Sequence, residues 1–205
     1  MSSGYCISIA GALFLYKTVL KEENMKNSKV TLVPLTQSDR EQFILDNQWA
    51  FKHGAMIEFG ERDDHIDGDG EIISRATIER CIDTEGSETY LIVADGRKVG
   101  GVILKIDKKT HHNHLEILYT LPDEHSKGYG YGAWCAIEKL HPETIVWETC
   151  TPYFEKRNIH FYVNKCGFKI DQFICEYFCP DYETTDEYNP DEGPDEMFRF
   201  IKVMK

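Results

Sequence analysis

The sequence has little positive charge and no long apolar run. Lysine and arginine total 23 against 35 aspartates and glutamates, which gives a formal net charge of −12. A nucleic-acid-binding protein or a polybasic protein of the membrane surface normally carries a basic stripe, so this balance argues against both classes. The most apolar stretch, residues 5–16 (YCISIAGALFLY), is too short for a membrane-spanning helix, which needs roughly 20 residues.

Paired cysteine motifs are missing as well. The seven cysteines are widely spaced, and none forms a C-x-x-C pair. In a chain of this length that pattern is typical of reduced thiols in a cytoplasmic protein. The nearest approach to a metal motif is His111-His112-Asn113-His114, which has no carboxylate or cysteine partner close by in the sequence. We therefore expect a solvated turn there and no metal site.

The first 24 residues differ from the rest in composition. Residues 5–16 are nearly all apolar, but no Lys or Arg precedes them and no small-residue cleavage site follows. They therefore do not match a secretory signal. We expect residues 1–24 to be an appended extension and residues 25–205 to form one domain of ordinary size. A membrane anchor remains the alternative for the extension.

Hydrophobic patterns predict an α/β domain with the element order β-α-α-β-β-β-α-β-α-β-β. A largely antiparallel run of strands is followed by a β-α-β crossover, which indicates one mixed sheet flanked by helices. The predicted strands are Lys29–Thr36, Thr89–Ala94, Lys98–Asp107, Leu115–Leu121, Thr144–Cys150, Phe168–Phe178 and Met197–Met204. The predicted helices run from a cap at 36–39 to about Lys52, then over Ser74–Asp83, Gly130–Leu140 and Glu155–Lys165.

The segment 115–134 (LEILYTLPDEHSKGYGYGAW) carries the clearest chemical signal. A predicted strand ends at Pro122, and Gly128-x-Gly130-x-Gly132 then opens a helix. Glycines let the backbone approach a ligand closely, successive N–H groups point outward, and the helix N-terminus adds partial positive charge. The pattern predicts a phosphate or pyrophosphate site. It is not a P-loop, whose Gly-Lys-Ser/Thr ending is absent, nor a Rossmann loop, which would follow the first strand.

This loop resembles the signature of the GNAT superfamily of acyl-CoA-dependent N-acetyltransferases, Q/R-x-x-G-x-G/A between a strand and a helix. The match is His125-Ser-Lys-Gly128-Tyr-Gly130, with His125 in the place of the usual Gln or Arg. The segment Asn158–Phe168 (NIHFYVNKCGF) is similar to a second family pattern, N-x-x-F-Y-x-K-x-G-F, with one extra residue after Tyr162. The resemblance covers about Lys29 to Lys205 and implies a GNAT fold.

The resemblance implies that acetyl-CoA is the co-substrate and where it binds. In the family, the strand before the glycine loop splays from its neighbour, and its unpaired backbone groups bind the pantetheine amides. The loop binds the pyrophosphate through backbone N–H groups. The cofactor-binding residues that the resemblance implies are Leu118, Tyr119, Thr120, His125, Ser126, Lys127, Gly128, Tyr129, Gly130, Tyr131 and Asn158.

Two residues are candidates for catalysis, because acyl transfer to an amine needs a base for the ammonium proton and an acid for the thiolate. Some relatives place a catalytic Glu on the key strand, which makes Glu116 the candidate base. Strand alternation predicts that Glu116 shares a face with Leu118 and Thr120. Relatives use a Tyr near the CoA sulfur, which makes Tyr162 the candidate acid, although the extra residue could rotate it by about 100°. A solvent-facing Glu and a core Tyr are the alternatives.

The negative charge is concentrated in two segments. Residues 58–71 hold seven acids against Arg62, and residues 179–196 hold eight acids and no Lys or Arg, so the rest of the chain is nearly neutral. In GNAT folds the corresponding segments border the acceptor groove. We therefore hypothesise that they favour a cationic acceptor, such as a polyamine, an aminoglycoside or a peptide amine. Solvated loops that aid solubility are the alternative.

The sequence thus predicts a cytoplasmic N-acetyltransferase that acts by direct transfer in a ternary complex. Its expected partners are acetyl-CoA and a small amine or peptide acceptor, with no nucleic acid and no membrane. The oligomeric state is open, a homodimer included. The rival hypothesis is a catalytically silent GNAT-fold module that binds acyl-CoA as a sensor or interaction domain.

Overall fold

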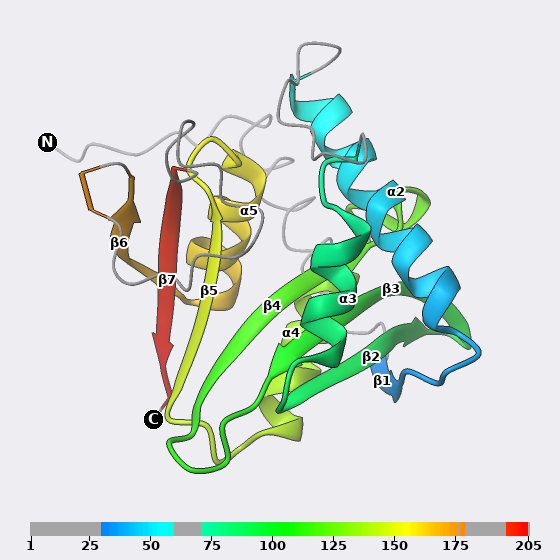
Figure 1. The fold of residues 1–205 in the computed structure, drawn as a ribbon, viewed down its shortest axis with the longest axis horizontal. Helices are drawn as coiled ribbons and strands as arrows, with labels where there is room; N and C mark the ends of the chain where they lie inside the picture. The colour runs from blue at the N-terminus through cyan, green and yellow to red at the C-terminus, as the bar shows by residue number, and fades with distance from the viewer. Residues whose placement is uncertain (1–29, 60–70, 176, 179–195, 205) are drawn as a thin grey trace, which may run out of the picture.

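Segments with alternating apolar residues build one seven-stranded sheet in the computed structural model of the chain. The structure describes residues 30–59, 71–175, 177–178 and 196–204. The strand order is β1-β2-β3-β4-β5-β7-β6, and all neighbours are antiparallel except the parallel pair β4 and β5 (Figure 1). The strands are β1 (Val30–Pro34), β2 (Ser87–Ala94), β3 (Arg97–Lys105), β4 (His112–Thr120), β5 (Val146–Pro152), β6 (Lys169–Ile174) and β7 (Met197–Val203).

Helices cover both faces of this sheet. Helices α2 and α3 lie on one face over β2 to β4, and α4 and α5 lie on the other (Figure 1). The Ser74 hydroxyl caps α3 by accepting the Thr77 N–H at 3.0 Å. The helical elements are α2 (Arg40–Phe59), α3 (Arg75–Asp83), the 3₁₀ turn η2 (Pro122–Glu124), α4 (Tyr129–Leu140), α5 (Lys156–His160) and the π-helical turn η3 (Phe161–Cys166).

The two faces bury separate hydrophobic clusters. On the α4 face, Trp134 packs edge-on against Trp147 at 5.6 Å between ring centroids and lies 4.9 Å from Phe168. On the α2 face, Phe43 packs against Tyr119 at 5.4 Å. A Cβ at Gly101 would lie only 2.4 Å from the Phe43 ring, so this position requires glycine for the close approach of helix and sheet.

The predicted mixed sheet with its β4-α4-β5 crossover is confirmed, with local corrections. The helix expected to end near Lys52 continues to Phe59, and β6 ends at Ile174 rather than at Phe178. His112 and His114 lie in β4 and not in a turn. The strand starts early because the buried Asn113 amide donates to the Thr144 hydroxyl and accepts the Asp107 N–H, at 2.8 and 2.9 Å.

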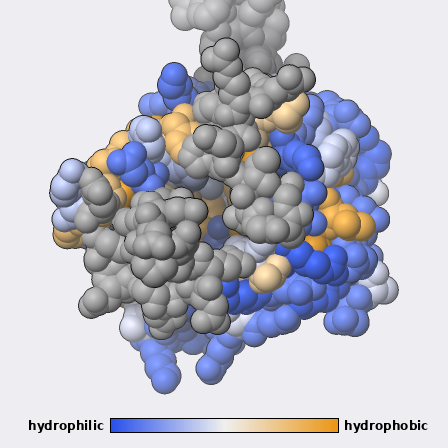
Figure 2. Space-filling view, turned by 45° about the horizontal axis from the view of Figure 1, so that its top comes forward, coloured by the Kyte–Doolittle hydropathy of each residue, from blue (hydrophilic) through white to orange (hydrophobic). Residues whose placement is uncertain are grey.

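Several predictions concern residues outside the described part of the chain. These are the extension 1–24, nearly all of the acidic segments 58–71 and 179–196, and the boundary at residue 25. Within the described residues, no helix combines the length and apolar character needed to cross a membrane. The described part of the face in Figure 2 is mainly hydrophilic, with hydrophobic areas in separate patches.

Candidate functional site

The parallel strands β4 and β5 pair only at their beginnings. The last aligned pair is His114 with Glu148. One residue further on, the Thr149 hydroxyl donates to the Leu115 carbonyl at 2.9 Å. Beyond this point the two strands separate, as their upper ends in Figure 1 show. The sheet therefore contains a wedge-shaped gap, with Thr149 at its vertex.

The register of β3 and β4 determines which backbone groups face this gap. The Leu121 N–H donates to the Val99 carbonyl at 2.9 Å, and the Tyr119 carbonyl oxygen lies against Gly100, where a Cβ would be 2.1 Å away. Successive residues of an antiparallel strand direct their N–H and C=O groups to opposite sides. Those of Leu118 and Thr120 are therefore directed toward the gap, whereas those of Tyr119 are directed toward β3.

The loop between β4 and α4 presents a series of unpaired N–H groups at the open end of the gap. Within the described residues, the N–H groups of residues 126–131 donate to no backbone carbonyl. Ser126 and Gly128 have positive φ angles of 62° and 82°, a geometry in which adjacent N–H groups converge on an anion. Gly132 has a different role, because its Cβ would lie 2.7 Å from the Val30 side chain.

His125 ties this loop to the end of β4. Its Nε2 atom lies 3.0 Å from the Thr120 carbonyl oxygen and donates to it in the tautomer that carries the proton there. Its ring also contacts the His53 ring of α2, with 5.7 Å between centroids. Burial lowers the pKa of His125, and the neighbouring Arg157 and His53 lower it further.

Lys127 and Asn158, two of the predicted cofactor contacts, bond to residues beside the gap. The Lys127 ammonium pairs with Glu124 at 2.8 Å, and Arg97 pairs with the same carboxylate at 3.1 Å. The Asn158 amide donates to the Thr151 hydroxyl of β5 at 3.3 Å. Lys127 thus belongs to the β4 side of the gap and Asn158 to the β5 side.

Glu116 occupies a β-bulge at the vertex of the gap. Ile103 of β3 pairs with Ile117 and the next residue pairs with Leu115, so Glu116 is the extra residue on β4. It is exposed, and its charge acts on Cys81 of α3, whereas Leu118 packs in the α4 cluster. The prediction that Glu116 shares a face with Leu118 and Thr120 is therefore wrong, because the bulge interrupts the two-residue alternation.

Tyr162 lies in the π-helical turn at the same vertex. This turn absorbs the extra residue noted in the sequence, and the Tyr162 carbonyl accepts the Phe168 N–H at 3.0 Å. Tyr162 is only 8% exposed, packs against Phe200 and lies close to the Thr149 hydroxyl. Burial raises its pKa, so the phenol keeps its proton through neutral pH.

Carboxylates gather on the α3 face of the sheet beyond the vertex. Trp147 and Thr149 face the α4 cluster, so the intervening Glu148 faces the opposite way. Arg199 of β7 pairs with Asp171 of β6 and lies 3.7 Å from Glu148. All three side chains are about one quarter exposed, and two carboxylates share one cation.

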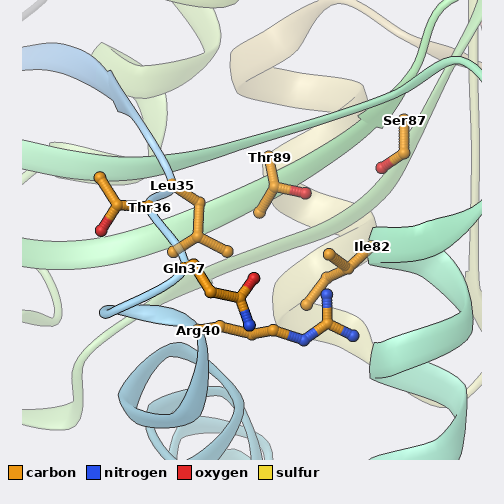
Figure 3. A pocket seen from close by; sticks show the side chains of 7 residues that line it. All are labelled: Leu35, Thr36, Gln37, Arg40, Ile82, Ser87 and Thr89. Carbon is orange, nitrogen blue, oxygen red and sulfur yellow. The ribbon is translucent and has the colours of Figure 1, made fainter.

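A pocket of about 220 Å³ lies elsewhere, between the β1–α2 turn, α3 and β2 (Figure 3). Gln37 and Arg40 enter it from one side and Ser87 and Thr89 from the other. The Arg40 guanidinium is engaged by Asp83 in two bonds of 2.7 and 2.6 Å. The pocket includes no residue of the β4–α4 loop, and we assign it no part in the site.

The structure thus brings most of the predicted site residues together around the gap, with Glu116 and Tyr162 at its vertex and the loop 125–131 at its mouth. Sequence reasoning missed Thr149, His53 and Arg157. No local motif marks them, because each is near the site through a contact between elements far apart in the chain. Within the described residues there is no group of three or more His, Cys, Asp or Glu side chains that could hold a metal ion.

The parallel strands β4 and β5 separate beyond their first residues. A glycine loop with free backbone N–H groups leads from β4 to the start of α4. Together these features define an acyltransferase fold of the mixed α/β class. The sequence profile of the Acetyltransferase (GNAT) family matches residues 45–168. The chain belongs to this family. The prediction of a GNAT acetyltransferase from the loop and the Asn158–Phe168 segment is thereby confirmed.

One curated protein is similar to this chain in sequence, and solved acetyltransferases are similar to it in fold. The uncharacterized protein YrkN of Bacillus subtilis (strain 168) is 40% identical over 180 residues, which cover 86% of this chain and 95% of the relative. The fold is similar to that of the spermidine N-acetyltransferase from Vibrio cholerae in complex with CoA and spermine, at 14% identity and a TM-score of 0.57 over 85% of this chain and 95% of that one. It is equally similar to the ribosomal-protein-S18-alanine N-acetyltransferase from Escherichia coli, at 12% identity and a TM-score of 0.58 over 85% and 93%.

Proposed function

We propose that the protein transfers the acetyl group of acetyl-CoA to a primary amine of a cationic acceptor, by direct attack in a ternary complex. The observation that supports this best is the gap between β4 and β5, which opens beside a loop of unpaired N–H groups. The pantetheine arm of CoA is an extended chain with amide groups, and it is joined to a pyrophosphate. The free strand edge suits the arm, and the anion site suits the pyrophosphate.

The backbone of β4 would hold the pantetheine arm. Leu118 directs its N–H and C=O groups toward the gap, and Thr120 its N–H, whereas the Thr120 carbonyl is bonded to His125 and the backbone groups of Tyr119 face β3. The N–H groups of Ser126, Lys127, Gly128, Tyr129, Gly130 and Tyr131 would bind the pyrophosphate. Asn158 and the Thr151 hydroxyl would line the opposite side of the same gap, at the end of β5.

The chemistry at the vertex is the attack of a neutral amine on the thioester carbonyl. A C–N bond forms, the C–S bond breaks, and the amine loses one proton while the thiolate gains one. Glu116 would take the amine proton, directly or through water, because it is exposed on the α3 face. Tyr162 would supply the proton to sulfur, because its buried hydroxyl remains protonated and lies beside Thr149 at the vertex.

The charge distribution supports a cationic acceptor. Glu148 and Asp171 share the Arg199 guanidinium, and Glu116 stands on the same face of the sheet. The acidic segments 58–71 and 179–196 would add to this field. One of the structural neighbours is a spermidine N-acetyltransferase, and its substrate is a polycation.

The decisive experiment separates cofactor binding from turnover. Acetyl transfer to spermidine, an aminoglycoside and a neutral amine is compared at about 20 and about 300 mM salt, alongside calorimetric titration with CoA. We expect CoA binding, and turnover that is highest for the cations and falls with salt. Turnover without a preference for cations would refute the acceptor class. CoA binding without transfer to any amine would favour the rival function, an acyl-CoA sensor.

A further inference from the structure

A cluster of three ionisable side chains surrounds the mouth of the gap, and the family signature includes only one of them. His125 comes from the loop, His53 from α2 and Arg157 from the first turn of α5. The two imidazole rings are in contact at 5.7 Å between centroids, and Arg157 is near enough for its charge to act on His125. Three elements that are far apart in the sequence thus bring potential cations to the mouth.

The position of this cluster is fixed by the bonds around it. The bond of His125 to the Thr120 carbonyl places its ring where β4 ends and the loop begins. Asn158, the neighbour of Arg157, bonds to Thr151 at the end of β5, and the Phe161 ring packs beside Gly130. The cluster therefore spans the mouth from the β4 side to the β5 side, next to the N–H groups of residues 126–131.

Arg157 also differs from four of the other arginines that the structure describes. Arg40, Arg75, Arg97 and Arg199 each form an ion pair with Asp or Glu. Arg157 is exposed and has no carboxylate within ion-pair distance among the described residues. A guanidinium left unpaired beside an N–H-rich loop has its donors available for a phosphate.

We infer that His53, His125 and Arg157 form a side-chain clamp for the phosphates of CoA, in addition to the backbone site of the loop. This inference rests on the proposed use of acetyl-CoA and names the side chains that would bind its phosphates. In a chain of net charge −12, a highly anionic ligand is repelled at long range. Arg157 of α5, together with His125 of the loop and His53 of α2 once they are protonated, offsets that repulsion at the mouth.

The clamp makes CoA binding proton-linked. Burial, Arg157 and His53 all lower the pKa of His125 in the free protein, and only its bond to the Thr120 carbonyl opposes them. Among the described residues, the groups that act most strongly on it include no acidic side chain. A bound phosphate would favour the imidazolium and raise this pKa, so binding takes up protons and strengthens as the pH falls toward the histidine range.

The test compares CoA with pantetheine, which has the same arm and no phosphate, in calorimetric titrations of the full chain. R157Q, H53Q and H125A should each weaken CoA binding roughly tenfold and leave pantetheine binding unchanged. R157K should retain part of the affinity, since it keeps the charge. H160Q, an exposed histidine one turn further along α5 that bonds Asn164, is the matched control and should bind CoA like the wild type.

Proton uptake gives a second readout that a structural role would not affect. Titrations in two phosphate-free buffers of different ionisation enthalpy should show more protons taken up by the wild type than by H125A. Unchanged CoA affinity in the three clamp variants, or equal losses for CoA and pantetheine, would overturn the clamp while leaving the acetyl-CoA proposal intact. If the wild type itself binds no CoA, the proposed function fails instead.

Discussion

The two ends of the gap beside β4 carry opposite charge. At the mouth, N–H groups of the loop join His53, His125 and Arg157, and the nearby Glu124 is neutralised by Lys127 and Arg97. On the α3 face at the vertex lie Glu116, Glu148 and Asp171. Arg199 is shared by Glu148 and Asp171, and Arg80 and Lys105 act on the same Cys81 thiol as Glu116. The protein as a whole is strongly acidic, and the mouth is an exception to this negative charge.

This difference indicates how two substrates of opposite charge can reach one reaction centre. In the proposed reaction, an anionic cofactor would be attracted at the mouth and a cationic amine at the far face, and each would be repelled from the other's entrance. The strand β4 separates the two regions. Its backbone lies on the proposed cofactor side, and its bulge turns Glu116 toward the α3 face, the proposed acceptor side. The predictions below test whether the two sides can be changed independently.

The largest effect should come from removing the proposed base, Glu116, on the α3 face. E116Q keeps the size of the side chain and loses its proton affinity, and we expect turnover to fall by about 100-fold or more. Calorimetric CoA binding should stay within about twofold of wild type, because Glu116 faces α3 and not the gap. E85Q, an exposed acid at the end of α3, is the control and should keep full activity. Normal turnover in E116Q would remove Glu116 from the mechanism.

Tyr162, the proposed acid at the vertex, should matter less than the proposed base. Y162F keeps the ring packing against Phe168 and Phe200 and removes only the hydroxyl. We expect kcat to fall about tenfold, since a thiol of pKa near 8.5 leaves with modest assistance. The CoA affinity and the melting temperature should change little. A large loss of thermal stability with normal specific activity would instead identify Tyr162 as a core residue.

A change of comparable size is expected when the loop is strained on the cofactor side. Gly128 has a φ of 82°, which costs a residue with a Cβ about 1 to 2 kcal/mol. G128A should therefore weaken CoA binding up to about tenfold without changing the relative preference among amines. G96A introduces the same kind of strain in the β2–β3 hairpin, where φ is 74°. It should lower stability and leave CoA affinity intact, and equal CoA losses in both would contradict a local role for the loop.

How far the sequence predicts this site depends on how far apart in the chain the interacting residues are. The loop 125–131 could be predicted because its glycines and flanking elements are contiguous in the chain. The bulge at Glu116 could not, since a strand pattern assumes strict alternation and the extra residue is defined only by pairing with β3. In the sequence, the π-helical turn at Tyr162 shows only as one surplus residue. Whether that residue rotates the Tyr162 side chain depends on how the helix accommodates it, which the sequence does not show.

Contacts between distant elements lay beyond sequence reasoning for the same reason. His53 carries no motif, and its ring meets His125 only because α2 crosses over the end of β4. The early start of β4 depends on a buried Asn113, a residue type that strand patterns disfavour. Where a side chain acts through long-range packing, hydrophobic periodicity indicates the element and its approximate bounds but not the partner.

The smallest expected effect tests the charge of the acceptor side directly. E148Q removes one of the two carboxylates that share Arg199, and the bond of Arg199 to Asp171 remains. Because Glu148 is partly exposed, its pull on a cationic amine is screened, and we expect the KM for spermidine to rise only about threefold at low salt. The difference should disappear at about 300 mM salt, and the KM for a neutral amine should not change. D123N, which removes an exposed acid from the cofactor side, should leave the amine KM unaltered. If D123N raises that KM as much as E148Q does, the acceptor responds to net charge alone, and the division of charge across β4 has no part in choosing it.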